Sequence, residues 1–161
     1  MTATATSQQI VTFRVGDDRF AADIFAVERV LRYQQPTVVP NLPEWIEGVI
    51  EYAHQVVPVI DLRRRLGLEH VEPRPETRII VFGLGDGWAA AVVDAVLEVT
   101  SVTAEQISPP PTLFRGLSAE YLRGLIRNGD RLVLLIEIAR LLTATERITL
   151  ERVTSEPPPH V

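Results

Sequence analysis

Residues 44–66 read EWIEGVIEYAHQVVPVIDLRRRL, and this stretch decides the fold because the chain repeats it 76 positions later. The second copy, residues 120–142, reads EYLRGLIRNGDRLVLLIEIARLL, and seven of the 23 aligned positions are identical. Conservative pairs such as Asp61 with Glu137 add to the match. The alternative is that any two β-hairpins look alike, but turn, strand and helix share one shift here. Self-similarity at a fixed offset is typical of a repeated structural unit, so the sequence favours an internal duplication.

Each copy contains two apolar runs separated by a turn, and the same pattern occurs twice more along the chain. Val- and Ile-rich runs with regular Gly, Asp and Asn turns favour an all-β barrel or sandwich. Helix is expected only in short segments, at 62–66, 139–142 and 144–153. The predicted hairpins pair Ile10–Val15 with Arg19–Ile24, Val49–Tyr52 with Val56–Ile60, Arg78–Phe82 with Trp88–Val93, and Leu122–Ile126 with Leu132–Ile136.

The duplication predicts how the chain is organised. The first and third hairpins also correspond, at shifts of 69 and then 68 positions, so each half holds two related hairpins. We expect one domain over residues 9–153, built from two similar lobes at about 10–70 and 78–142 that share an interface. The segments 1–8 and 154–161 are polar or rich in proline, and we expect them to be flexible tails.

Composition excludes several classes of protein. The 161 residues carry a net charge of −5, are 46% hydrophobic and include no cysteine. This apolar content excludes a solvated disordered chain, and the missing cysteine excludes disulfides, thiolate nucleophiles and Cys-based zinc clusters. The acidic balance argues against a nucleic-acid partner. The chain shows no signal peptide and no apolar run near the roughly 18 residues needed for direct membrane insertion, so we expect an intracellular protein.

No set of residues in the sequence assembles an active site. The glycines of 83–87 are followed by a strand-like run, whereas a phosphate-binding loop needs a helix there, so a hairpin turn is expected. Asp61 and Glu137 are repeat mates that each precede a short helix, and capping explains both better than catalysis does. Asp94 follows an apolar run and has no assigned role. We therefore expect no enzyme and no catalytic residues.

The histidines and the basic run give no site either. His54, His70 and His160 are too scattered for a metal cluster, and no cysteine completes one, so no metal and no cofactor are expected. Residues 63–65 form a run of three arginines in an acidic protein. A solvated helix face is the simpler interpretation, and a local acidic partner is the alternative.

Taken in order, four segments resemble the CheW family, the adaptors of bacterial chemotaxis arrays. The second segment, residues 39–68, contains Pro-Asn-x-Pro, then Gly-Val, a turn, and Val-Pro-Val-Ile-Asp-Leu-Arg. The resemblance as a whole covers roughly Gln9 to Val153. Agreement in several separated motifs is more specific than agreement in any single one. The segments are FRVGDDRFAADIFAVERVL (13–31), VPNLPEWIEGVIEYAHQVVPVIDLRRRLGL (39–68), AVVDAVLEVTSVTAEQISPPP (91–111) and EYLRGLIRNGDRLVLLIEIARLL (120–142).

This resemblance implies both a fold and a function. The fold is mainly β, with two SH3-like five-stranded β-barrel lobes around a shared hydrophobic core and short helices after the lobe strands and at the C-terminus. The function is that of a non-catalytic scaffold, which binds the regulatory domain of a CheA-type histidine kinase and the cytoplasmic tip of chemoreceptors. Such an adaptor is cytoplasmic and is recruited to membrane-associated receptor arrays.

The resemblance also implies a receptor-binding surface. In the family, the segment after the first hairpin contacts the receptor helix bundle, and here it supplies Ile24, Val27 and Val30. Gly48 precedes the central strand and belongs to a segment that is linked to partner binding in the family. These four positions are therefore expected on partner surfaces.

Three positions of the same surface depart from the family. The family commonly has an acidic residue at the place of Arg29, and its turn arginine and turn glycine are replaced by Ala53 and His54. Loss of that glycine predicts a reshaped turn, because glycine is the residue most at ease at positive φ. We interpret the changed charges as a divergent adaptor tuned to a non-standard receptor, since charge complementarity often sets specificity.

Two alternative functions stay open at this point. One is a CheW-like adaptor of a non-flagellar chemosensory pathway, for example one that governs pili. The other is a small-ligand sensor that uses the cleft between its lobes, which would need convergent polar groups among apolar walls.

Overall fold

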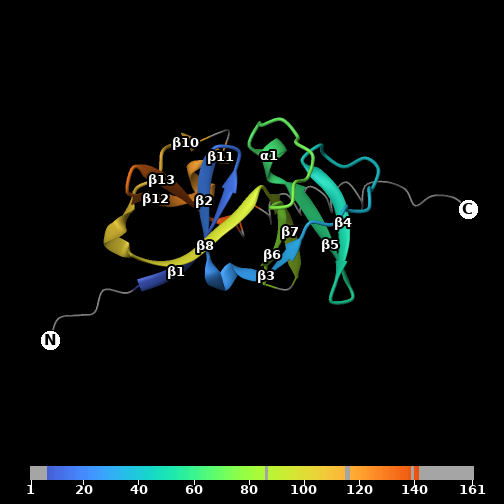
Figure 1. Cartoon of the computed structure of the whole chain (residues 1–161), viewed down its shortest axis with the longest axis horizontal. Helices are drawn as coiled ribbons and strands as arrows, with labels where there is room; N and C mark the ends of the chain where they lie inside the picture. The colour runs from blue at the N-terminus through green and yellow to red at the C-terminus, as the bar shows by residue number, and fades with distance from the viewer. Residues whose placement is uncertain (1–6, 86, 115–116, 139, 142–161) are drawn as a thin grey trace, which may run out of the picture.

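The computed structural model describes residues 7–85, 87–114, 117–138 and 140–141, and they form two large twisted β-sheets, one small two-stranded sheet and short helical turns (Figure 1). The elements in the first half are β1 (Ser7–Val15), β2 (Asp18–Asp23), η1 (Ile24–Ala26), β3 (Val27–Arg32), β4 (Ile46–Tyr52), β5 (Gln55–Asp61) and α1 (Leu62–Arg65). Those in the second half are β6 (Arg78–Gly83), β7 (Trp88–Val93), β8 (Ala95–Thr103), η2 (Ala104–Gln106), β9 (Ile107–Ser108), β10 (Leu113–Phe114), β11 (Leu117–Ser118), η3 (Ala119–Tyr121), β12 (Leu122–Asn128) and β13 (Arg131–Ile136).

The mainly β fold and all four predicted hairpins are confirmed. They are β1–β2, β4–β5, β6–β7 and β12–β13, each antiparallel, with ends within three residues of the predicted ones. The hairpin reasoning missed two long strands, β3 and β8. Both are outer strands that bury few side chains, so they lack the alternating apolar pattern that marks a half-buried strand.

Each sheet takes hairpins from both halves of the chain. The strand order is β8-β1-β2-β13-β12-β9 in one sheet and β3-β6-β7-β5-β4 in the other. The expected contiguous lobes at about 10–70 and 78–142 therefore need correction, because β1–β2 lies with the second half and β6–β7 with the first. These two hairpins have similar apolar patterns, so the linear sequence does not reveal which of them pairs with which half.

The exchange of the β1–β2 and β6–β7 hairpins between the two halves preserves the duplication. Read along each sheet, β8, β1, β2, β13 and β12 match β3, β6, β7, β5 and β4, and each sheet has one parallel pairing, β13 with β2 or β5 with β7. Single contacts repeat as well: the amide of Asp61 donates to the Trp45 carbonyl at 2.6 Å, and that of Glu137 donates to the Tyr121 carbonyl at 2.7 Å. The internal repeat is therefore structural.

The core has three parts, because both faces of the sheets are covered. The largest part lies between the sheets and takes side chains from both, including Phe13, Phe20, Ile60 and Phe82. Alternate side chains of the same strands fill one smaller core within each sheet. The shared core that the resemblance implied is therefore present.

The sheets differ from two closed five-stranded barrels, since one has six strands and the other five. Among the described residues, no backbone pairing joins the outer strands β3 and β4 of the five-stranded sheet. Side chains bridge these strands instead: the Tyr52 hydroxyl donates to Glu28 at 3.3 Å, and Tyr33 donates to Glu47 at 3.4 Å. The five-stranded sheet thus curls without closing its hydrogen-bond ladder.

The helical segments are short. The prediction at 62–66 is confirmed by α1, and Ile138, Arg140 and Leu141 are helical near the predicted 139–142. The predicted helix at 144–153 and the tails at 1–6 and 154–161 lie outside the described residues. None of the helices in the described part of the chain has the length and apolar character to cross a membrane.

Candidate functional site

The segment expected to contact a receptor forms η1 and the outer strand β3. Ile24 and Val27 are partly buried, and Val27 packs against the core between the sheets. Val30 is 40% exposed, and Phe25, which the sequence analysis did not single out, is 94% exposed. An exposed phenylalanine on a folded domain is the kind of feature that marks a partner surface when other apolar groups adjoin it.

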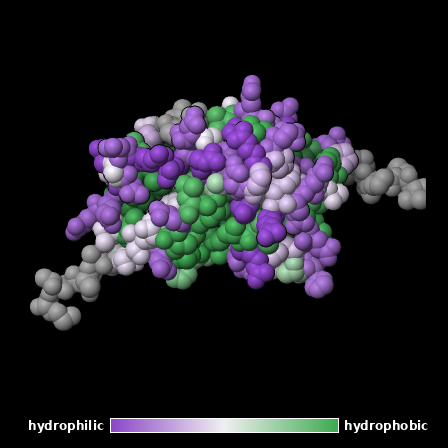
Figure 2. All heavy atoms as spheres, in the orientation of Figure 1, coloured by the Kyte–Doolittle hydropathy of each residue, from purple (hydrophilic) through white to green (hydrophobic). Residues whose placement is uncertain are grey.

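Further apolar side chains are exposed on β8, the outer strand of the other sheet. Leu97 is 36% exposed and Val99 is 55% exposed. Both β3 and β8 lie toward the viewer in Figure 1, and the same view in Figure 2 shows an apolar patch over this part of the molecule. We call Phe25, Val30, Leu97 and Val99 the apolar face.

The turn between β4 and β5 keeps the hairpin geometry that its sequence disfavours. Tyr52 pairs directly with Gln55, which leaves Ala53 and His54 as a two-residue loop. Their φ angles are 47° and 64°, so both residues lie in the left-handed region. The ladders on either side hold this two-residue loop, and the cost of replacing glycine appears as backbone strain, while a change of turn shape relative to the family stays a prediction.

The curl of the sheet brings this turn toward β3. The hydrogen bond from Tyr52 to Glu28 joins the end of β4 to the start of β3, so Ala53 follows a residue that contacts the neighbour of Arg29. Arg29 is exposed, and the described residues include no ion-pair partner for it. The two segments that sequence analysis linked through altered charges are thus connected in space.

Gly48 is buried and has a packing role. Its φ is 148°, and a Cβ there would clash with the backbone carbonyl oxygen of Thr37. Thr37 and Val49 exchange two backbone hydrogen bonds at 2.8 and 2.9 Å, which fixes the connection before β4 against that strand. Gly48 therefore shapes this surface through the backbone, since it has no side chain to present.

The cap predicted for α1 is present. The Asp61 Oδ1 atom accepts hydrogen bonds from the amides of Arg63 and Arg64 at 3.0 and 3.4 Å. The repeat mate of Asp61, Glu137, instead lies with its Oε1 atom 2.8 Å from the Nε atom of Arg123. The cap is therefore confirmed for Asp61, and Glu137 forms an ion pair; residue 139, which is equivalent to Arg63, lies outside the described residues, so capping by Glu137 stays a prediction.

The three arginines of α1 have partners within the chain, so the acidic-partner interpretation of 63–65 holds for the first two. Arg63 pairs with Asp94, Arg64 lies 3.6 Å from Asp61, and the Arg65 guanidinium lies 6.0 Å from the Trp45 ring centroid.

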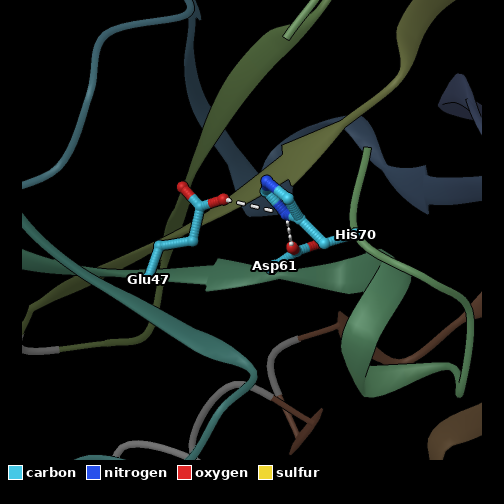
Figure 3. Close-up of side chains that lie close together, drawn as sticks. All are labelled: Glu47, Asp61 and His70. Atoms are coloured by element: carbon cyan, nitrogen blue, oxygen red, sulfur yellow. Dashed lines mark hydrogen bonds and ion pairs between the residues drawn. The ribbon is translucent and has the colours of Figure 1, made fainter. Parts of the chain in front are cut away.

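A cluster of two carboxylates and one imidazole lies beside this cap (Figure 3). The Nδ1 atom of His70 is 2.9 Å from Oδ2 of Asp61 and 4.0 Å from Oε1 of Glu47. Burial and the adjacent Asp61 carboxylate raise the pKa of Glu47, and burial together with Glu47 raises the pKa of Tyr33 to about 12. The cluster thus brings a buried and a partly buried carboxylate together beside an exposed imidazole.

Two hollows meet at the cluster. One has a volume of about 30 Å³ and extends toward Asp94, and the other is an open groove of about 580 Å³. Tyr33, Glu47 and His70 line both of them. Sequence reasoning missed this arrangement because it compared the histidines only with each other, and His70 lies in a stretch without periodicity.

Comparisons with known proteins agree with these features. A family model described as the CheW-like domain matches residues 9–146. "Chemotaxis protein CheW" of Klebsiella aerogenes is 36% identical over 91% of this chain and 88% of its own length, and "Protein FrzA" of Myxococcus xanthus is 34% identical over 87% and 89%. The crystal structure of the scaffolding protein TtCheW from Thermoanaerobacter tengcongensis superposes with a TM-score of 0.75 at 29% identity, covering 84% of this chain and 88% of that one. This chain belongs to the CheW family, the non-catalytic scaffold proteins of chemotaxis.

Proposed function

We propose that this protein is a cytoplasmic adaptor that couples chemoreceptors to a CheA-type histidine kinase and is recruited with them to membrane-associated arrays. Family membership supports the scaffold role, which needs no bond-making chemistry. It needs two surfaces whose contacts differ between signalling states, so that receptor conformation alters kinase activity.

The receptor tip docks on the apolar face and on the adjoining segment that holds Arg29 and the Ala53–His54 turn. The observation that carries this assignment is the 94% exposure of Phe25 beside the half-exposed Val30 on an outer strand. An amphipathic receptor helix buries such side chains in its apolar stripe. Arg29 and the Ala53–His54 turn then lie at the rim, where charge selects the partner.

The kinase regulatory domain docks at a hairpin end. Val56 and Leu132 are repeat mates, 76 positions apart, and they are 72% and 54% exposed. Their hairpins, β4–β5 and β12–β13, lie at opposite ends of the long axis in Figure 1. The β4–β5 and β12–β13 hairpins thus give the protein two apolar ends with the same backbone arrangement. Such ends suit a scaffold whose binding partner, here the kinase regulatory domain, has a related fold.

Reconstitution with the genomic CheA-type kinase and a chemoreceptor cytoplasmic fragment tests the proposal. Phe25→Ser is expected to weaken receptor co-sedimentation by roughly tenfold or more while kinase binding persists. Leu132→Ser serves as its matched control, since it removes an exposed apolar side chain far from the apolar face and is expected to leave receptor binding unchanged. Absence of binding between the unmodified protein and any CheA regulatory domain would refute the adaptor role.

A further inference from the structure

The Glu47–Asp61–His70 cluster has the donor set and spacing of a metal site. One donor atom from each side chain lies within 4.8 Å of the other two, and the closest pair is 2.9 Å apart. Ligand atoms about 2.1 Å from a common ion are separated by roughly 3 to 4 Å, so small side-chain rotations suffice. The donors come from β4, the end of β5 and the loop after α1, and Figure 3 shows all three side chains converging.

The internal repeat provides a second, independent observation. The repeat mate of Glu47 is Arg123, and the repeat mate of Asp61 is Glu137. In the second copy the Arg123 guanidinium lies 2.8 Å from Glu137 and 3.8 Å from Asp23, so a fixed cation joins two carboxylates. The first copy has a carboxylate where the second has that cation, and two acids therefore face each other without the arginine.

The surroundings leave one oxygen of each carboxylate for an ion. The Oδ1 atom of Asp61 accepts amides of α1, so Oδ2 is the atom that faces His70. Tyr33 donates to Oε2 of Glu47 and leaves Oε1 toward the imidazole. Arg64 lies 3.6 Å from Oδ2 of Asp61, but its side chain is 41% exposed and also bonds the Glu44 carbonyl, so it can withdraw.

Other nearby charges do not block the site. Arg63 is held by Asp94, and Arg14 lies 4.0 Å from the same carboxylate. Glu72, on the same loop as His70, lines both hollows and adds negative charge. The open groove supplies a path for a hydrated ion and room for the waters that would complete its coordination.

We propose that Glu47, Asp61 and His70 bind a divalent transition-metal cation, with Zn²⁺ the best match. Nδ1 of His70 supplies a nitrogen ligand, and the two carboxylates supply oxygen, with water in the remaining positions. Imidazole favours zinc over magnesium or calcium, which prefer oxygen alone. The ion pins the loop after α1 to β4 and β5, a role independent of the adaptor function proposed above.

Calorimetric titration of the chelator-stripped protein with ZnCl₂ tests the site. We expect one equivalent to bind, and a free zinc concentration 100-fold above Kd to raise Tm by roughly 5 to 10 °C. His70→Ala and Glu47→Gln are expected to abolish this response. His54→Asn, which removes an exposed imidazole from the β4–β5 turn, is the matched control and is expected to keep it.

The most informative variant is Glu47→Arg, which copies the ion pair of the second repeat into the first. It is expected to fold, to match or exceed the Tm of the metal-free parent, and to ignore zinc. The proposal is overturned if the unmodified protein binds no zinc, or if Glu47→Arg and His70→Ala still bind one equivalent while His54→Asn loses it.

Discussion

Arg63 and Asp94 form an ion pair that joins α1 to the junction between β7 and β8. The Nε atom of Arg63 lies 3.1 and 3.0 Å from the two carboxylate oxygens. The same carboxylate accepts the amide of Gly16 at 2.7 Å, and Gly16 belongs to the turn of the β1–β2 hairpin in the other sheet. Asp94, which had no role from sequence, is therefore a contact point between the two sheets.

Asp94→Ala is expected to lower the free energy of unfolding by about 2 to 4 kcal/mol, because the substitution leaves a partly buried guanidinium and a backbone amide without their acceptor. Urea unfolding followed by circular dichroism measures the change. Asp17→Ala is the control, because it removes an exposed carboxylate beside Gly16 in the β1–β2 turn. It is expected to change stability by less than about 0.5 kcal/mol. Equal effects of the two substitutions would show that Asp94 does not hold the sheets together.

The β4–β5 turn is expected to gain stability when its strain is removed. Ala53 and His54 both have positive φ, and a non-glycine residue in the left-handed region costs roughly 1 to 2 kcal/mol. His54→Gly should therefore raise the free energy of unfolding by about 1 kcal/mol after the entropy of the unfolded glycine is counted. Differential scanning calorimetry tests this.

The corresponding turn of the second repeat supplies the opposite control. Gly129 occupies the position equivalent to Ala53 and has a φ of 63°. Gly129→Ala is expected to destabilise by about 1 kcal/mol. If both substitutions shift Tm in the same direction, backbone strain is not what distinguishes the two turns.

Most of the fold that can be predicted from the sequence follows from its turns and apolar runs. Each hairpin is local, so residues such as Asn128 and Gly129 specify it regardless of distant contacts. The exchange of β1–β2 and β6–β7 depends instead on pairing across the chain, as in the parallel contact of Leu134 with Phe20, and no local signal encodes that choice.

The residues of the proposed functional surfaces follow only in part from the sequence. Arg29 and the Ala53–His54 turn followed from comparison with a family pattern, and the structure links them through Tyr52 and Glu28. The metal candidate did not follow, because Glu47 and His70 are 23 residues apart and meet only when the loop after α1 folds back on β4. Burial of Asp61, which makes the cluster chemically distinctive, is likewise a tertiary property.

Gly48→Ala is expected to destabilise the protein by about 2 to 4 kcal/mol. The added Cβ would meet the backbone oxygen of Thr37, which cannot rotate away as a side chain can, and φ is unfavourable for an L residue. Gly87→Ala, where nothing lies within 4 Å of the added atom, is the matched control. Partner affinity at low temperature should persist in the folded fraction of Gly48→Ala; a selective loss of binding at unchanged Tm would mean that Gly48 contacts the partner directly.

The charges at the rim of the proposed receptor surface are expected to set specificity. Arg29→Glu with Ala53→Arg introduces the charges that the resemblance to the CheW family implies at these places, on two segments that Tyr52 and Glu28 connect. Exposed charge pairs contribute about 0.2 to 1 kcal/mol each, so the two restored charges together should make the double variant bind an ordinary chemoreceptor tip roughly two- to thirtyfold more tightly. The gain should shrink at high salt, because exposed charges are screened. Surface plasmon resonance at two ionic strengths measures both effects, with Arg127→Gln, on the other sheet, as a control that makes the same net change of charge. Affinity for an ordinary tip that stays unchanged in the double variant would contradict the interpretation of a receptor-tuned adaptor, since the altered charges would then have no bearing on partner choice.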